Sequence, residues 1–367
     1  TKKVVEDVQD EPELLIDEPE IILDEEELTK SSGLSAEIFM VLERKSYEMC
    51  NLEYDELIAT KSTEVVPCGR IIYSDSSAGA SIGCYGMSVK ASRLAKSSYG
   101  HCDDDGYFVC DKSFKHDWKY TVFFSRTDFE MRRDTSTEEV MLVFTDRHGP
   151  LNLEFTSTSS YNDNIYYCEI LRAACKYYYD NIDGLHRPPL ASELNDRLYI
   201  QAIRGESNDN LLGTYGLDSH SVPAISVYRD DSGSNRLSAS IYCTTIHELA
   251  HASHWNQNRS IYSSCASKVK DTFATGVGVY LTRKVHPSFT YSYGGNYSGL
   301  VEDMIDDDGF VAGSLEYHEN IRGFTIQQVE NSVLGVTTWQ GWQDRIEQLY
   351  PNNINAMNIC TLFAIWN

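Results

Sequence analysis

The sequence has no apolar run close to the roughly 20 residues that a membrane-spanning helix needs, which argues against an integral membrane protein. It contains no CxxC pair and no glycine-rich phosphate loop, so zinc ribbons, thioredoxin-type redox sites and nucleotide binding have no support. Basic residues are scarce: 31 Lys and Arg stand against 55 Asp and Glu, a formal net charge of −24. This charge argues strongly against a nucleic-acid partner, because phosphates would be repelled over most of the surface.

Acidic residues are concentrated near the start of the chain. Residues 1–27 carry 12 acidic and 2 basic side chains, and the block from Glu6 to Glu27 mixes them with prolines and short aliphatic pairs. Such a block repels itself and buries little apolar surface, so we expect residues 1–34 to form a disordered acidic tether.

The composition of the following stretch indicates strands. From Gly69 to about Arg132, short runs rich in Ile, Val, Tyr and Phe alternate with turn residues, which predicts an antiparallel β-sandwich within residues 35–150. The runs Gly69–Ile72, Gly86–Ala91 and Asp104–Phe108 resemble the carboxypeptidase-regulatory or transthyretin-like sandwich. That resemblance implies a spacer or docking module.

Residues 151–367 mix helices with a few strands. Apolar spacing predicts helices over 164–181, 240–255, 265–283 and 300–306, and strands over 197–203 and 223–228. The predicted fold class is therefore α+β, with a β-sandwich followed by a mixed domain.

The predicted helix over 240–255 contains an HExxH pattern, His247-Glu248-Leu249-Ala250-His251. Residues four apart lie one turn apart on one helix face, so both imidazoles can bind one metal ion. At this point the chain resembles the zincin metallopeptidases. The resemblance implies that His247 and His251 bind Zn²⁺, that Glu248 is the general base, and that residues 151–367 are a metallopeptidase domain.

A third protein ligand is needed for a catalytic zinc site. The metzincin continuation HExxHxxGxxH is excluded because His254 and Gln257 stand at its last two defined positions. We expect His254 to pack or to be a hydrogen-bond partner, with a contact to the substrate as the alternative. Two carboxylates remain. Asp271 shares a helix face with small residues, and the stretch Asp271–Val277 resembles the ESWAxGV helix of secreted bacterial gluzincin-like peptidases, with Asp for Glu. Glu302 is the alternative, and we expect its side chain to point to solvent.

Two further features concern a substrate. Tyr291, Tyr293 and Tyr297 lie in a Gly/Ser-rich loop and are candidates for stabilising an oxyanion, although with 24 tyrosines in the chain we favour their being ordinary loop residues. We expect a substrate peptide to pair as an added strand beside the predicted strand that contains Ile225 and Tyr228.

Together these features favour a gluzincin-like zinc peptidase that acts on a peptide or protein. Five of the ten cysteines fall between Cys50 and Cys110, which favours an oxidising compartment. We expect a secreted or surface-anchored bacterial protein, whose signal segment or lipid anchor would lie upstream of Thr1. The alternative is a zincin-fold surface binding or adhesion protein with little or no turnover.

Overall fold

The structure is a computed structural model of the whole chain. It describes residues 4–7, 64–134, 136–147, 149–157, 162–194, 196–205, 212–217, 223–231, 234–305, 323–352 and 356–367. Two compact units divide the chain. The first comprises residues 1–73, 82–124 and 138–155, and the second comprises 74–81, 125–137 and 156–367. The predicted tether over residues 1–34 lies outside the described residues, except for a short strand at Val4–Asp7.

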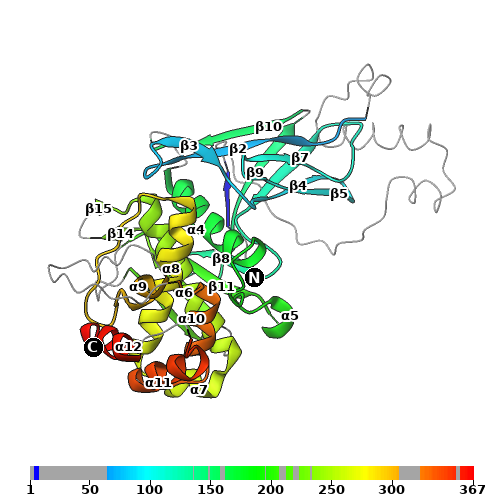
Figure 1. Cartoon of the computed structure of the whole chain (residues 1–367). Helices are drawn as coiled ribbons and strands as arrows, with labels where there is room; N and C mark the ends of the chain where they lie inside the picture. The colour runs from blue at the N-terminus through cyan, green and yellow to red at the C-terminus, as the bar shows by residue number, and fades with distance from the viewer. Residues whose placement is uncertain are drawn as a thin grey trace. The chain divides into compact units, whose positions relative to one another are not determined.

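The strand Phe129–Arg133 belongs to the second unit. The other strands up to residue 155 form two sheets (Figure 1). The first sheet has the order β1-β9-β7-β4-β5, and β10-β2-β3 form the other, with β6 beside β2. The bounds are β1 Val4–Asp7, β2 Cys68–Asp75, β3 Ala80–Gly83, β4 Ser88–Arg93, β5 Lys96–His101, β6 Tyr107–Val109, β7 Trp118–Phe123, β9 Val140–Arg147 and β10 Leu151–Phe155.

Pairing in the first unit is mostly antiparallel. The pairs β4–β5, β4–β7, β7–β9 and β2–β6 are antiparallel, whereas β1 runs parallel to β9 and β10 runs parallel to β2. Alternate residues of β4 are buried, Val89 and Ala91 among them, as a strand with one face on a core requires. Trp118 and Tyr120 fill that core edge to face, with ring centroids 5.9 Å apart.

The second unit contains a mixed sheet of order β12-β13-β11-β8, formed by β8 Phe129–Arg133, β11 Leu198–Ile203, β12 Gly213–Leu217 and β13 Pro223–Tyr228. β11 is parallel to both β8 and β13, and β12 is antiparallel to β13. The expectation that a substrate would pair beside β13 is wrong, because β11 and β12 already occupy its two edges. The terminal strand on that side is β12.

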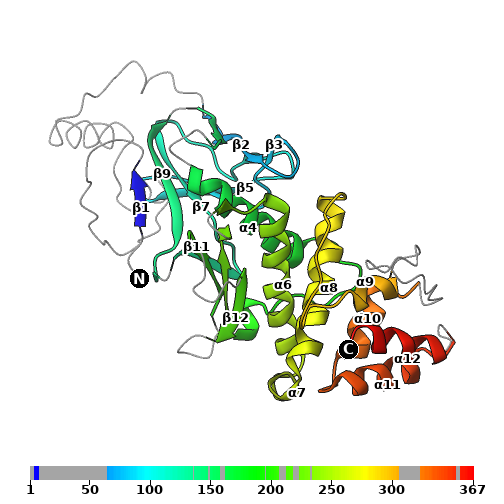
Figure 2. The same ribbon diagram turned by 90° about the vertical axis from the view of Figure 1, so that its left-hand side faces the viewer.

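Helices cover this sheet. Figure 2 shows β11 and β12 on one side of α6 and helix α8 on the other, and α6 also contacts α4. The bounds are α4 Asn162–Tyr179, α5 Ala191–Leu194, α6 Ser238–Gln257, α7 Arg259–Ser264, α8 Ser267–Val285, α9 Leu300–Ile305, α10 Ile326–Val333, α11 Trp339–Leu349 and α12 Ala356–Ile365. A small hairpin pairs β14 Asp230–Asp231 with β15 Ser234–Asn235.

Glycines allow α8 to approach its neighbours closely. A Cβ on Gly278 would lie 3.1 Å from the carbonyl oxygen of Cys243 in α6, and one on Gly276 would overlap Val301 of α9. The sequence pattern of small residues on the face of Asp271 predicts this close approach, and the structure confirms it at Gly278. α6 is consequently buried on almost every side, with residues from Ser238 to Trp255 inside the unit.

The predicted α+β class is confirmed, with β-sheets first and a helical region around a mixed sheet second. Within the described part of the chain, no helix is both long enough and apolar enough to cross a membrane.

Candidate metal centre

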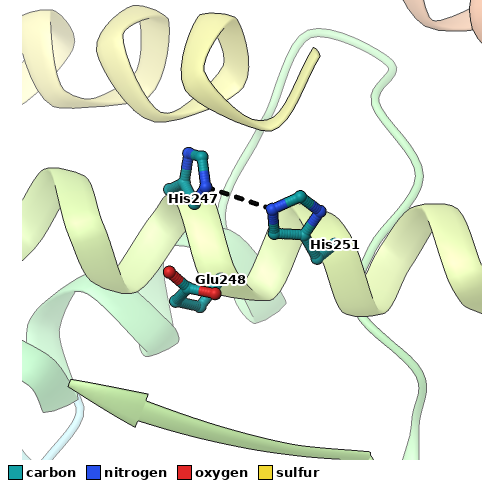
Figure 3. A group of neighbouring side chains, drawn as sticks. All are labelled: His247, Glu248 and His251. Carbon is teal, nitrogen blue, oxygen red and sulfur yellow. Dashed lines mark hydrogen bonds between the residues drawn. The ribbon is translucent and has the colours of Figure 1, made fainter. Parts of the chain in front are cut away.

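Two histidines of α6 face each other. His247 and His251 lie four residues apart, and their Nε2 atoms are 3.1 Å apart (Figure 3). The rings are perpendicular, with centroids 4.7 Å apart, and both residues are at least nine-tenths buried. One N or O atom from each of His247, Glu248 and His251 lies within 4.8 Å of the others. These three residues therefore form a candidate metal site, as the HExxH spacing predicts.

Burial keeps both imidazoles neutral. It lowers the pKa of His247 to about 4 and that of His251 well below its ordinary value, and repulsion from the protonated forms of His247 and His254 and from Lys270 adds to the effect at His251. Neutral imidazole is the form that binds a metal ion. At neutral pH no proton has to leave these rings before a cation enters.

Hydrogen bonds to the far ring nitrogens orient both rings. Oγ1 of Thr275 in α8 lies 3.3 Å from Nδ1 of His247, and it donates its own hydrogen to the carbonyl oxygen of Asp271. Thr275 can therefore only accept from His247, which places the ring proton on Nδ1 and leaves the Nε2 lone pair toward His251. The hydroxyl of Tyr262 lies 3.1 Å from Nδ1 of His251 and can donate or accept there.

Asp271 of α8 lies beside this pair. Its Oδ1 is 3.6 Å from Nε2 of His251, and burial, the largest influence, raises the pKa of the carboxyl to about 6. Tetrahedral ligands about 2.0–2.1 Å from zinc are separated from each other by about 3.3 Å. The separations of 3.1 Å between His247 and His251 and of 3.6 Å between His251 and Asp271 lie on either side of that value.

Glu302, the alternative ligand, is occupied elsewhere. Its carboxylate pairs with the guanidinium of Arg283 and accepts a hydrogen bond from the hydroxyl of Tyr293. The expectation that Glu302 points to solvent is wrong, because its side chain is only 21% exposed and held by both partners.

The carboxyl of Glu248 projects toward the sheet (Figure 3). A Cβ on Gly213 of β12 would lie 2.7 Å from Oε1 of Glu248, so only glycine leaves room for the carboxyl at that point. Burial raises the pKa of Glu248 well above its ordinary value. The Asp271 carboxylate adds to this shift, and Arg236 opposes it. A carboxylate with a raised pKa is a stronger base than an ordinary one.

The three loop tyrosines differ in position. Tyr297 is 38% exposed, and its ring centroid lies 5.7 Å from that of His247. Tyr293 is held by Glu302, and Tyr291 lines a cavity along the first half of α6. The ring of Tyr297 therefore lies beside the candidate site and is partly exposed.

His254 packs, as expected from its place one turn beyond His251. Its ring makes edge-to-face contacts with Tyr262 and Phe273, with centroids 5.1 and 5.6 Å away, and burial lowers its pKa to about 4. His254 therefore contributes to the packing between α6, α7 and α8.

Four residues of the site are missing from the sequence-based prediction. Tyr215 of β12 stacks on His251 with centroids 6.0 Å apart, and the other three are Gly213, Tyr262 and Thr275. The sequence could have indicated Thr275, because it lies four residues after Asp271 on the same helix face. The others lie in elements whose pairing with α6 only the three-dimensional fold reveals.

Comparison with models of known protein families finds no match for this chain. Comparison with curated protein sequences finds none either. The function of the chain has therefore to be inferred from the geometry of the site itself.

Proposed function

We propose that the chain is a zinc-dependent peptidase, with His247, His251 and Asp271 as the metal ligands. The observation that supports it most directly is the pair of buried, neutral imidazoles whose Nε2 atoms converge at 3.1 Å. The buried carboxyl of Glu248 adjoins them on the side of the sheet. Two lone-pair nitrogens at this separation repel each other unless a proton or a cation lies between them.

The chemistry assigned to the site is hydrolysis of a peptide bond. A bound zinc ion would supply a Lewis acid that polarises a carbonyl and lowers the pKa of a water to about 7. Glu248 accepts the proton of the attacking water on its carboxylate and returns it to the leaving amine. Its raised pKa makes it a stronger base for the first step. Tyr297 is placed to donate a hydrogen bond to the developing oxyanion.

The substrate that this arrangement favours is an extended peptide. β12 is the terminal strand of the mixed sheet, and its residues Gly213 and Tyr215 contact Glu248 and His251. A peptide that adds to the outer edge of β12 would run alongside the metal ligands. A cavity of about 550 Å³ lined by Thr244, one turn before Glu248, could take a substrate side chain. The secreted or surface location stays a prediction.

The decisive experiment compares the zinc content and the proteolytic activity of the wild type with those of Glu248→Gln. The wild type, loaded with zinc, should cleave an unfolded protein substrate, and the variant should lose at least about 100-fold of that rate while it keeps its zinc. Zinc binding without turnover in the wild type would favour the alternative, a surface binding protein. Equal activity of both proteins would refute the role of Glu248.

A further inference from the structure

A second buried cluster of metal-ligating side chains lies within the second unit. Asp75 ends β2, Glu169 lies in α4, and His286 directly follows α8. One ligand atom from each residue lies within 4.8 Å of the others. Their exposed fractions are 2%, 0% and 6%. Three separate elements therefore bring buried metal-ligating side chains together. None of these residues belongs to the HExxH site.

The ligand atoms of Asp75 and His286 are fixed in place but have no hydrogen-bond partner. Oδ1 of Asp75 accepts from the backbone N–H groups of Ser77 and Ala78, at 2.8 and 2.9 Å, which leaves Oδ2 directed into the cluster. Oδ2 of Asp75 and Nε2 of His286 are both buried without a hydrogen-bond partner among the described residues, 3.9 Å apart. Tyr242 packs its ring edge to face on His286, with centroids 5.6 Å apart.

The charges of the cluster favour a cation. Asp75 and Glu169 bring two negative charges, and Arg172, whose Nη1 is 3.8 Å from Oδ2 of Asp75, brings one positive charge. Counted formally with His286 neutral, these four side chains sum to −1, a charge that a bound cation would offset.

Two cavities border the cluster. A cavity of about 550 Å³ is lined by Asp75 and Glu169, and a second cavity of similar volume is lined by His286. A metal site needs an entry path and room for the water that completes its coordination.

We propose that Asp75, Glu169 and His286 bind a second divalent metal ion of the zinc class. One imidazole nitrogen and two carboxylate oxygens are ligands that zinc takes readily, whereas calcium prefers oxygen ligands alone. The ion links the end of β2, the middle of α4 and the end of α8, so its role is structural. Its binding free energy adds to the stability of the second unit.

The test disables the HExxH site and measures how much zinc the chain still binds. Full-length wild type and the His247→Ala/His251→Ala variant are stripped with a chelator, reloaded with Zn²⁺ alone and analysed for metal per chain. We expect about two zinc ions in the wild type and about one in the double variant. Adding His286→Gln to the double variant should remove the remaining ion and the upward shift in thermal midpoint that zinc produces. Adding His186→Gln, at a histidine paired with Glu330, should change neither.

Several outcomes would overturn the second site. One zinc in the wild type and none in the double variant would do so, as would an ion that survives His286→Gln. A zinc-edge anomalous difference map of wild-type crystals gives a check that does not depend on variants folding. A peak between Asp75, Glu169 and His286 supports the proposal, and an empty position at saturating zinc refutes it. A peak here without one at His247 would contradict only the proposed peptidase.

Discussion

Oγ1 of Thr275 lies 3.3 Å from Nδ1 of His247 while it donates to the backbone carbonyl of Asp271, 2.6 Å away. One hydroxyl thus connects two of the proposed ligands on neighbouring helices. It also fixes the tautomer of His247, because the threonine has no second hydrogen to donate. Partners of this kind orient a ligand and raise its basicity.

Replacing Thr275 with valine should therefore weaken zinc binding. The shape is kept but the acceptor is lost, and we expect the zinc dissociation constant to rise about 10–100-fold, measured by competition with a chelator. Thr282→Val is the matched control, because Thr282 makes the same bond to a backbone carbonyl in α8 and is equally buried. Equal affinities for Thr275→Val and the wild type would show that His247 does not depend on this hydroxyl.

Two variants test which carboxylate is the third zinc ligand. Asp271→Asn removes the charge beside His251, so zinc affinity should fall by more than the roughly 100-fold that the loss of a supporting partner causes. Glu302→Gln should leave zinc affinity close to that of the wild type, because its carboxylate is held by Arg283 and Tyr293. Metal content after dialysis measures both. If zinc affinity falls in Glu302→Gln but not in Asp271→Asn, the third ligand is Glu302 of α9.

Gly213 should control the position of the general base. In Gly213→Ala the new methyl group would lie 2.7 Å from Oε1 of Glu248 and 2.6 Å from Cγ2 of Thr244. The carboxyl must move, so we expect kcat to fall about 10–100-fold while zinc content is unchanged. Gly216→Ala in the same strand is the control, since a Cβ there meets nothing within 4 Å. Equal losses in both variants would point to a general effect on β12.

Much of the α-helical framework could be predicted from the sequence. The helix expected over 240–255 is α6, Ser238–Gln257, and the one expected over 265–283 is α8, Ser267–Val285. Their apolar and small residues recur at helical spacing, which is a local signal. The strand expected over 223–228 is β13, Pro223–Tyr228, and its signal is also local, because apolar residues alternate along it.

What the sequence could not reveal is which strands pair. The run Phe129–Arg133 reads like its neighbours in the β-rich stretch, yet β8 pairs with β11 nearly 70 residues later. Strand β12, Gly-Thr-Tyr-Gly-Leu, has two glycines and a weak strand pattern, so it was not predicted, although it supplies Gly213 and Tyr215 to the site. Asp75 and His286 are likewise 211 residues apart, and only the tertiary fold brings them together.

A pH-dependent contribution to stability should come from His186. Its Nδ1 lies 2.9 Å from Oε2 of the buried Glu330, and this hydrogen bond raises the pKa of His186 above its ordinary value of 6.5, against the effect of burial. The folded state therefore favours the protonated ring. Its contribution is fully present below the unfolded pKa of 6.5 and is lost as the pH rises through the higher folded value.

We therefore expect the free energy of unfolding of the wild type to exceed that of His186→Gln most at about pH 5.5 and least at about pH 8.5. The change in this difference should be at most about 1 kcal/mol, because the His186 side chain is 42% exposed and solvent screens the pair. Urea unfolding in excess chelator measures it without interference from metal binding. All other titrating groups are common to the two proteins, so a difference that is constant or grows with pH would contradict the assignment.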